Sequence, residues 1–260
     1  MEKRCYTGYH TIEELLKQKG IFGTLAVSKE NRKVLSLIQL AERKGVKVIR
    51  ISENEMDRIC GWNVRTGAYS AGSSGGPKKH REIALILSKM PQKKNADFND
   101  ALNKLTKNAA LILVLDEITD PQNFGAILRS ADQLSVDLVV VSSRKSAETN
   151  ETVVKVSSGA AVYVPVAVVS NIVQAIEKLK KYGFWVYGAD MSGISILKTN
   201  LKGKTAVVMG SEGKGLRRLI RERCDALISI PSFGHVDSFN VSVAAGIIMY
   251  ETRRQQGILD

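Results

Sequence analysis

Short apolar runs alternate with longer amphipathic segments along the whole chain. Continuous or nearly continuous apolar runs predict strands at 24–27, 46–49, 83–87, 110–115, 138–141, 162–169, 184–187, 205–209 and 227–230. Apolar residues at helical spacing predict helices at 10–20, 30–44, 53–60, 101–107, 123–134, 171–182, 216–223 and 242–255. Such alternation predicts an α/β chain with an open, mostly parallel sheet and helices on both of its faces.

Two domains are expected from this pattern. Residues 1–88 form a small α/β domain, and a Gly/Ser-rich basic loop at 71–79 precedes its closing strand. Residues 89–106 are polar around Pro91 and are predicted to be a linker. The second domain, 107–260, opens with the wholly apolar run 110–115, which suits a buried parallel strand.

The charge of the chain is unevenly distributed. The 260 residues include 38 Lys+Arg and 26 Asp+Glu, giving a net charge of +12, and the isoelectric point is about 9.6. Residues 1–106 carry a net +9, from 20 basic and 11 acidic side chains, and 107–260 carry a net +3. A solubilising surface is one explanation. Concentration of charge in one segment favours binding of a polyanion, most commonly nucleic acid.

The cysteines and the apolar runs indicate in which compartment the protein is expected. Cys5, Cys60 and Cys224 form no C-x-x-C pair, and the three histidines are far apart, so neither a disulfide framework nor a metal site is predicted. This usage fits a reducing cytosol, and a cytoplasmic protein is expected. No secretory signal is visible, and no apolar run approaches the ~18 residues of a membrane span.

The first motif of chemical interest is D-P-Q-N-F-G-A-I-L-R at 120–129, directly after the strand predicted at 110–115. Ligands of open α/β sheets bind beyond the carboxyl ends of the strands, which is where Asn123 falls. Arg129 offers a permanent charge and a planar fork suited to phosphate. Equally, Asp120 and Asn123 could serve only as helix caps, with Arg129 a solvated charge.

The second motif is G-S-E-G-K-G-L at 210–216, after the strand at 205–209. It has neither the G-x-x-x-x-G-K-[S/T] spacing of a P-loop nor the G-x-G-x-x-G spacing of a dinucleotide site. Glu212 would repel a phosphate, so an adenosine-bearing ligand without phosphates fits better. The alternative is a Gly-rich turn with a glutamate near a helix start.

The third motif, I-P-S-F-G-H-V-D-S-F-N-V-S-V-A-A-G-I at 230–247, leads from a strand into a helix rich in small residues. Ser238 and Asn240 crowd the start of that helix. As caps they would be unremarkable, but another strand end precedes them, so we expect them in the same crevice as the first two motifs.

Together these three segments resemble the SpoU/TrmH family of RNA ribose 2′-O-methyltransferases in the SPOUT superfamily, with its N-x-G-x-x-x-R, G-S-E-G-x-G-L and I-P-x-x-G-x-V-x-S-x-N-V-S-V-A-A-G-I patterns. The intervening segments 146–150 and 155–161 are also similar. Gly8-Tyr-His10 resembles the start of the family's substrate-binding domain, which is similar to a ribosomal-protein RNA-binding fold. The subgroup that methylates a guanosine ribose in the peptidyl-transferase region of 23S rRNA is the most similar.

The chain departs from the family pattern in three places. Phe239 replaces the usual Leu in one wall of the cofactor pocket, and Val162 replaces a frequent Glu. His80-Arg-Glu82 stands where the front domain usually has His-Gln-Gly, after the added Gly/Ser loop.

The resemblance implies a trefoil-knotted catalytic domain, a homodimer and S-adenosylmethionine as cofactor, with rRNA or tRNA as substrate. Arg129 would orient the phosphate and activate the hydroxyl. The other residues implied to form the catalytic site are Asn123, Glu212, Ser238 and Asn240. The residues implied to hold the cofactor are Met209, Gly210, Gly215, Ser229, Ile230 and Phe239.

Three alternatives keep the same fold. One is an antibiotic-resistance methyltransferase acting on another rRNA nucleotide, and another is a tRNA ribose methyltransferase. The third is a non-catalytic RNA-binding protein, against which the intact Asn123, Arg129, Glu212 and Asn240 argue.

Overall fold

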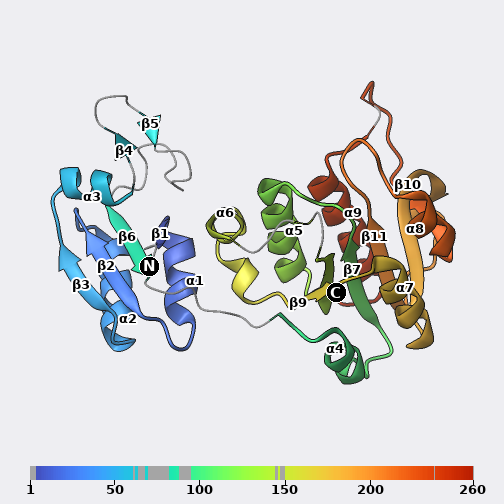
Figure 1. Cartoon of the computed structure of the whole chain (residues 1–260), viewed down its shortest axis with the longest axis horizontal. Helices are drawn as coiled ribbons and strands as arrows, with labels where there is room; N and C mark the ends of the chain where they lie inside the picture. Colours follow the sequence, from blue (N-terminus) through green and yellow to red (C-terminus); the bar gives the residue numbers. More distant parts are fainter. Residues whose placement is uncertain are drawn as a thin grey trace. The chain divides into compact units, whose positions relative to one another are not determined.

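The computed structural model describes residues 4–60, 62–63, 68–69, 82–87, 95–143, 146, 150–236 and 238–259. The chain divides into two compact units. Unit 1 comprises Met1–Lys93 together with Thr149–Val162, and unit 2 comprises Lys94–Glu148 together with Tyr163–Asp260. Figure 1 traces the chain through both units, and each is described here by itself. The Gly/Ser-rich loop expected at 71–79 lies outside the described residues.

Unit 1 is built on a four-stranded sheet in the order β1-β6-β2-β3. Its strands are β1 (Arg4–Thr7), β2 (Gly23–Val27), β3 (Lys47–Arg50) and β6 (Ile83–Leu87). β6 is antiparallel to β1 and β2, and β2 is parallel to β3. A separate two-stranded sheet joins β4 (Trp62–Asn63) and β5 (Ala68–Tyr69).

The helices of unit 1 follow the apolar spacing of the sequence. They are α1 (Tyr9–Lys17), α2 (Arg32–Arg43), α3 (Glu53–Ile59) and α6 (Glu151–Val156), with a 3₁₀ turn η2 (Ala160–Val162). The side chain of Asn31 accepts hydrogen bonds from the amides of Lys33 and Val34 and so begins α2. Ser52 and Glu55 form a reciprocal capping box at the start of α3.

Unit 2 contains a six-stranded sheet in the order β12-β10-β11-β7-β8-β9. The strands are β7 (Ala110–Leu115), β8 (Leu138–Ser142), β9 (Val166–Val169), β10 (Trp185–Ser195), β11 (Lys204–Met209) and β12 (Ala226–Ser229). Every pair in this sheet is parallel. All strands therefore end at the same edge, and the expected parallel α/β architecture is confirmed.

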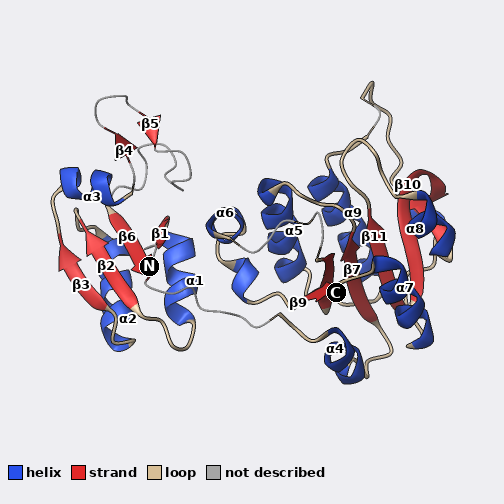
Figure 2. Ribbon diagram, viewed as in Figure 1, coloured by secondary structure: helices blue, strands red, loops and turns tan. Residues whose placement is uncertain are grey.

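Helices cover both faces of this sheet (Figure 2). They are α4 (Phe98–Lys104), α5 (Pro121–Gln133), α7 (Ile172–Lys181), α8 (Arg218–Arg223) and α9 (Val241–Gln255), with a 3₁₀ turn η3 (Ile196–Lys198). One face packs Ile112 and Val114 against Ile176 of α7 and Ile220 of α8. On the other face α9 packs against α5, β7 and β11.

Several boundaries differ from the sequence-based expectation. Residues 160–162 form η2, and β9 begins only at Val166, after Pro165, whose ring nitrogen has no hydrogen to donate to a ladder. β10 continues to Ser195 instead of ending at 187. The proposed linker 89–106 includes α4, whose Leu102 is buried in the core of unit 2. Strand β1 and helix α6 were not predicted.

Two further features bear on chemistry. The three cysteines are free thiols, and the described residues contain no cluster of three or more side chains suited to a metal ion. Among the helices of the described ranges, none is both long enough and apolar enough to span a bilayer.

Candidate active site

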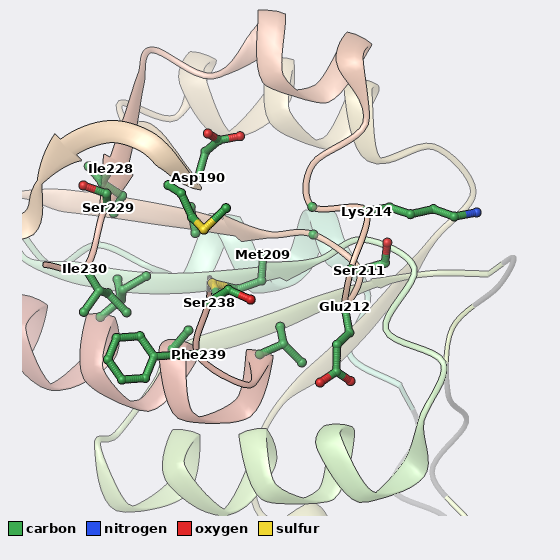
Figure 3. A pocket seen from close by; sticks show the side chains of 18 of the residues that line it. Asp190, Met209, Ser211, Glu212, Lys214, Ile228, Ser229, Ile230, Ser238 and Phe239 are labelled. Carbon is green, nitrogen blue, oxygen red and sulfur yellow. The ribbon is translucent and has the colours of Figure 1, made fainter. Parts of the chain in front are cut away.

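A cavity of about 400 Å³ lies at the carboxyl ends of β10, β11 and β12. Its walls come from the three loops that follow these strands and from the first turns of α9 (Figure 3). All six residues expected to hold a cofactor line it: Met209, Gly210, Gly215, Ser229, Ile230 and Phe239. Its volume lies within the ~300–1,000 Å³ typical of small-molecule sites.

The loop after β11 curls tightly and presents its main chain to the cavity. A Cβ atom on Gly210 would lie 2.2 Å from the carbonyl carbon and oxygen of Gly215, so only glycine fits there. The Gly215 amide donates to the Ser211 carbonyl over 2.9 Å, which closes the turn. Lys214 extends away from the cavity, whereas Ile230 and Phe239 lie together on one wall. The cavity thus combines main-chain polar groups with apolar side chains.

Three residues from the three sequence motifs meet in one hydrogen-bonded cluster. Asn123 donates through Nδ2 to Glu212 Oε2 over 3.0 Å. Asn240 donates through its own Nδ2 to Asn123 Oδ1 over 3.0 Å and to Glu212 Oε1 over 3.2 Å. Asn123 is only 8% exposed, so the cluster is held partly out of water. Because the carboxylate accepts from both amides, each side chain is fixed by the other two.

The structure shows which of these side chains cap helices and which bond to one another. Asp120 caps α5 by accepting from the Gln122 amide, and Asn123 instead uses its side chain in the cluster. Asn240 does both: its Oδ1 accepts from the Ser242 amide over 2.9 Å while its Nδ2 reaches Asn123 and Glu212. The first turns of α5 and α9 are therefore locked to the glycine-rich loop.

Ser238 and Arg129 occupy different positions. Ser238 lines the cavity beside Phe239. Arg129 lies on an exposed face of α5, six positions after Asn123 and so about 240° further around the helix. It does not line the cavity, and within the described part of the chain it makes no hydrogen bond or ion pair. The structure of the single chain does not bring Arg129 into the cluster.

The structure adds residues that sequence reasoning missed. Asp190 and Met191 at the extended end of β10, and Arg221 of α8, also line the cavity. Arg221 donates to Asp190 over 3.0 Å and to Ser192 Oγ over 2.6 Å, and the Ser192 amide donates to Asp190 over 2.9 Å. The only sequence signal was a polar residue soon after the strand predicted at 184–187.

The carboxyl of Asp190 is held ionised by these neighbours. Burial by itself would raise its pKa. The hydrogen bonds from Ser192 and the positive charge of Arg221 outweigh burial, so the pKa of Asp190 lies below its ordinary value. One wall of the cavity therefore carries a fixed ion pair.

This chain is similar to known RNA methyltransferases. The model of the SpoU rRNA methylase family matches residues 110–250, and a model described as RNA 2′-O ribose methyltransferase substrate binding matches residues 7–66. An uncharacterized tRNA/rRNA methyltransferase of Borreliella burgdorferi is 43% identical, over 89% of this chain and 97% of its own length. The 23S rRNA (guanosine-2′-O-)-methyltransferase RlmB of Neisseria meningitidis is 40% identical, over 93% of this chain and 97% of its own.

Solved structures show the same fold. A crystal structure of an RNA 2′-O ribose methyltransferase superposes with a TM-score of 0.76 and 23% identity, covering 98% of this chain and 89% of that one. The SpoU methyltransferase AviRb of Streptomyces viridochromogenes, in complex with AdoMet, gives 0.70 and 22%, covering 98% and 90%.

The chain belongs to the SpoU rRNA methylase family. The resemblance inferred from the three motifs is confirmed, and with it an RNA ribose methyltransferase as the class of enzyme.

Proposed function

We propose that this protein transfers a methyl group from S-adenosylmethionine to the ribose 2′-hydroxyl of a guanosine in 23S rRNA, in the cytoplasm. The observation that carries the proposal is the joining of Asn123, Glu212 and Asn240, from three distant motifs, beside a glycine-walled cavity. The relative from Neisseria meningitidis, whose name specifies 23S rRNA and guanosine, supports the choice of substrate.

The cavity suits an adenosine-bearing sulfonium without phosphates. Ile228, Ile230 and Phe239 provide apolar surface for a base, and the turn at 210–215 offers main-chain donors and acceptors. The carboxylate of Glu212 at its wall opposes a phosphate, whereas the charge of Asp190 is balanced by Arg221. When bound, S-adenosylmethionine would supply an already activated methyl group.

The residues of the chain then have to align and activate a weak nucleophile. A ribose hydroxyl must lose its proton during attack, and alignment can supply much of the rate. The cluster of Asn123, Glu212 and Asn240 would fix the entrance to the cavity and position the ribose. Arg129 would bind the adjacent phosphate and orient the hydroxyl, since its planar, permanently charged guanidinium suits phosphate and is a poor base.

Residues 1–88, the larger part of unit 1, would select the RNA. Residues 1–106 carry a net +9 of the total +12, which supports a role in holding a polyanion. A domain boundary near 88 and a linker before 107 were expected from the sequence, and the proposal for RNA selection concerns residues 1–88.

We also propose a homodimer and a knot. Val243 and Tyr250 of α9 are 49% and 55% exposed, and Ile258 and Leu259 beyond it are also exposed, which supports burial against a second copy. β12 lies at the sheet edge, whereas the following α9 packs on the central strands β7 and β11, which supports threading of the terminal segment through a loop. Light scattering should give twice the 28.5 kDa chain mass.

Two measurements test the proposed function. Calorimetry with S-adenosylhomocysteine should show one site per subunit, with ATP and NAD giving no heat. Methyl transfer to 23S rRNA transcripts should place the label on a guanosine ribose, and a deletion strain should lack that modification. Methylation of a tRNA or of another rRNA nucleotide would show that the proposed substrate is wrong. Absence of cofactor binding and of methyl transfer would reject the function.

A further inference from the structure

Unit 1 contains a polar cluster at the starts of three elements. Tyr9 opens α1, Asn31 caps α2 and Glu82 directly precedes β6. The Tyr9 hydroxyl donates to Glu82 Oε2, and Asn31 Nδ2 donates to the same oxygen over 2.6 Å. Asn31 Nδ2 also lies 3.0 Å from the Tyr9 hydroxyl oxygen. The cluster is partly exposed.

Among the described residues, hydrogen bonds reach only one of the two oxygens of the Glu82 carboxylate. Its Oε2 accepts two hydrogen bonds, which fill its two lone pairs. Its Oε1 accepts none from the residues that the structure describes. Tyr9 and Asn31 thus hold the side chain in place, and Oε1 keeps two acceptor positions that no described residue fills.

Basic side chains gather at the start of α2, and the one acidic neighbour among them, Glu30, is paired with Arg50. Lys29 precedes α2, Arg32 and Lys33 lie in its first turn, and all three are exposed. The ammonium of Lys33 lies 5.8 Å from the centre of the Tyr9 ring, which places a cation over the ring whose hydroxyl contacts Glu82. A carboxylate on a surface that binds a phosphate backbone weakens that binding, unless it receives donors from a base.

We propose that Glu82 is a guanine-reading residue for single-stranded RNA, with Lys33 binding the neighbouring phosphate and with Tyr9 and Asn31 as positioning residues. Guanine places two donors, N1–H and the 2-amino group, side by side on its Watson–Crick edge, and these match the two open positions of Oε1. Adenine and uracil each place an acceptor on that edge, which the carboxylate would repel. The edge is accessible only in unpaired RNA. The inference deepens the proposed function, since it takes RNA as the substrate.

The test uses the full chain and short single-stranded RNAs. Oligouridines carrying one central guanosine, inosine or adenosine are titrated by fluorescence anisotropy. Wild type should bind the guanosine RNA about tenfold more tightly than the adenosine RNA, with inosine, which lacks the 2-amino group, between them. Glu82→Gln retains an oxygen for Tyr9 and Asn31 but turns an amide donor toward the base, and it should lose this order.

Matched variants separate base reading from general charge. Lys33→Ala should weaken binding of all three RNAs equally and lower the salt slope by about 0.7, the value for one phosphate of a single strand. Tyr9→Phe should reduce the guanosine preference without changing the slope. Glu42→Gln and Lys44→Ala, exposed at the far end of α2, are the controls and should keep the preference.

The outcomes also distinguish this inference from the proposed function. A wild type that methylates 23S rRNA but binds the three oligonucleotides equally would overturn the guanine site and leave the function intact. A guanosine preference that depends on Glu82 in a protein without methyl transfer would reject the function and keep the site. If circular dichroism shows that Glu82→Gln does not fold, the test rests on wild type alone. Wild type must then bind the guanosine, inosine and adenosine RNAs with affinities that fall in that order.

Discussion

Arg217 donates two hydrogen bonds to Asp116, from Nε to Oδ2 over 2.8 Å and from Nη2 to Oδ1 over 2.6 Å, across 101 positions of the chain. Asp116 is only 1% exposed, and its amide donates to the Met209 carbonyl over 2.9 Å. The hydrogen bonds from Arg217 to Asp116 raise the pKa of the guanidinium further. The pair therefore ties the β7–α5 loop to the β11–α8 loop, and Asn123 in the first turn of α5 binds Glu212 of that same β11–α8 loop.

Replacing Arg217 should destabilise the protein through the buried carboxylate that it leaves. Arg217→Gln is expected to lower the free energy of unfolding by about 2–3 kcal/mol, less than for a fully buried pair because the Arg217 side chain is 53% exposed. The measurement is urea unfolding at neutral pH. Arg218→Gln, which breaks an exposed pair with Glu222, is the control and should cost no more than about 0.5 kcal/mol. Equal losses for the two variants would contradict a structural role for the Asp116 pair.

A substitution in the glycine-rich loop should weaken binding of the cofactor. Gly210→Ala forces the loop apart, because its Cβ would meet the main chain of Gly215 at 2.2 Å. We expect affinity for S-adenosylhomocysteine to fall at least about tenfold, or ~1.4 kcal/mol. Gly203→Ala adds a methyl group with no atom within 4 Å and should bind like wild type. Calorimetry on both variants measures this, and an unchanged affinity for Gly210→Ala would place the cofactor elsewhere.

The lowered pKa of Asp190 predicts how the stability of the protein depends on pH. Burial opposes its ionisation, but Ser192 and Arg221 together lower its pKa in the folded state. A carboxyl with a lowered folded pKa stabilises the protein above its unfolded pKa of about 3.9, and this contribution is lost as pH falls through the folded pKa. Arg221→Ala should therefore cost up to about 1 kcal/mol at pH 7, and the cost should shrink below about pH 4.

Urea unfolding of Arg221→Ala and wild type between pH 7 and pH 3 measures that difference. Arg223→Ala is the control on the same helix, because its partner Glu177 has a side chain that is 43% exposed. Its effect should be small at every pH. A cost for Arg221→Ala that stays constant down to pH 3 would show that the ion pair with Asp190 does not cause it.

Arg129 should matter for methyl transfer and not for folding. Its exposure and lack of partners among the described residues predict that Arg129→Ala changes stability by less than about 0.5 kcal/mol. Cofactor affinity should also stay unchanged, because Arg129 does not line the cavity. Methyl transfer to 23S rRNA should fall to background, and Arg129→Lys should recover little, since it lacks the planar fork. Turnover near the wild-type rate in Arg129→Ala would remove Arg129 from the mechanism.

The strands of the parallel sheet were predictable where burial alone dictates the sequence. β7 has the predicted bounds, 110–115, because a central strand covered on both faces must be apolar at every position. The end of β10 was not predictable: Asp190-Met-Ser-Gly is not apolar, and it pairs with β12 only after a register shift between Ala189 and Ile194. β1 escaped prediction since Tyr6 is its one fully buried residue.

The candidate site likewise contains features that the sequence predicts and features that it does not. Asn123, Glu212 and Asn240 could be predicted because each follows the end of a parallel strand, and all such ends share one edge. Their mutual hydrogen bonds, like the pairing of Asp116 with Arg217, depend on loop conformations that no local pattern encodes. Arg221 was missed because it lies within a helix and reaches the cavity by side-chain length.

The charge distribution predicts that residues 1–88 contribute most of the salt dependence of RNA binding. A fragment of residues 107–260 should bind S-adenosylhomocysteine but methylate rRNA poorly. Its binding of rRNA fragments should show a salt slope smaller than that of the full chain by at least about 2, which corresponds to roughly three phosphate contacts.

Helix α6 affects how this fragment should be made. Helix α6 lies within the fragment by sequence, but it belongs to unit 1, where it packs against β1, and its Val153 and Val154 are fully buried. The fragment would expose these two side chains, so Val153→Ser with Val154→Ser should improve its solubility. Titrating the full chain and this fragment at several salt concentrations makes the comparison. Equal slopes and equal turnover would show that unit 2 selects the RNA by itself.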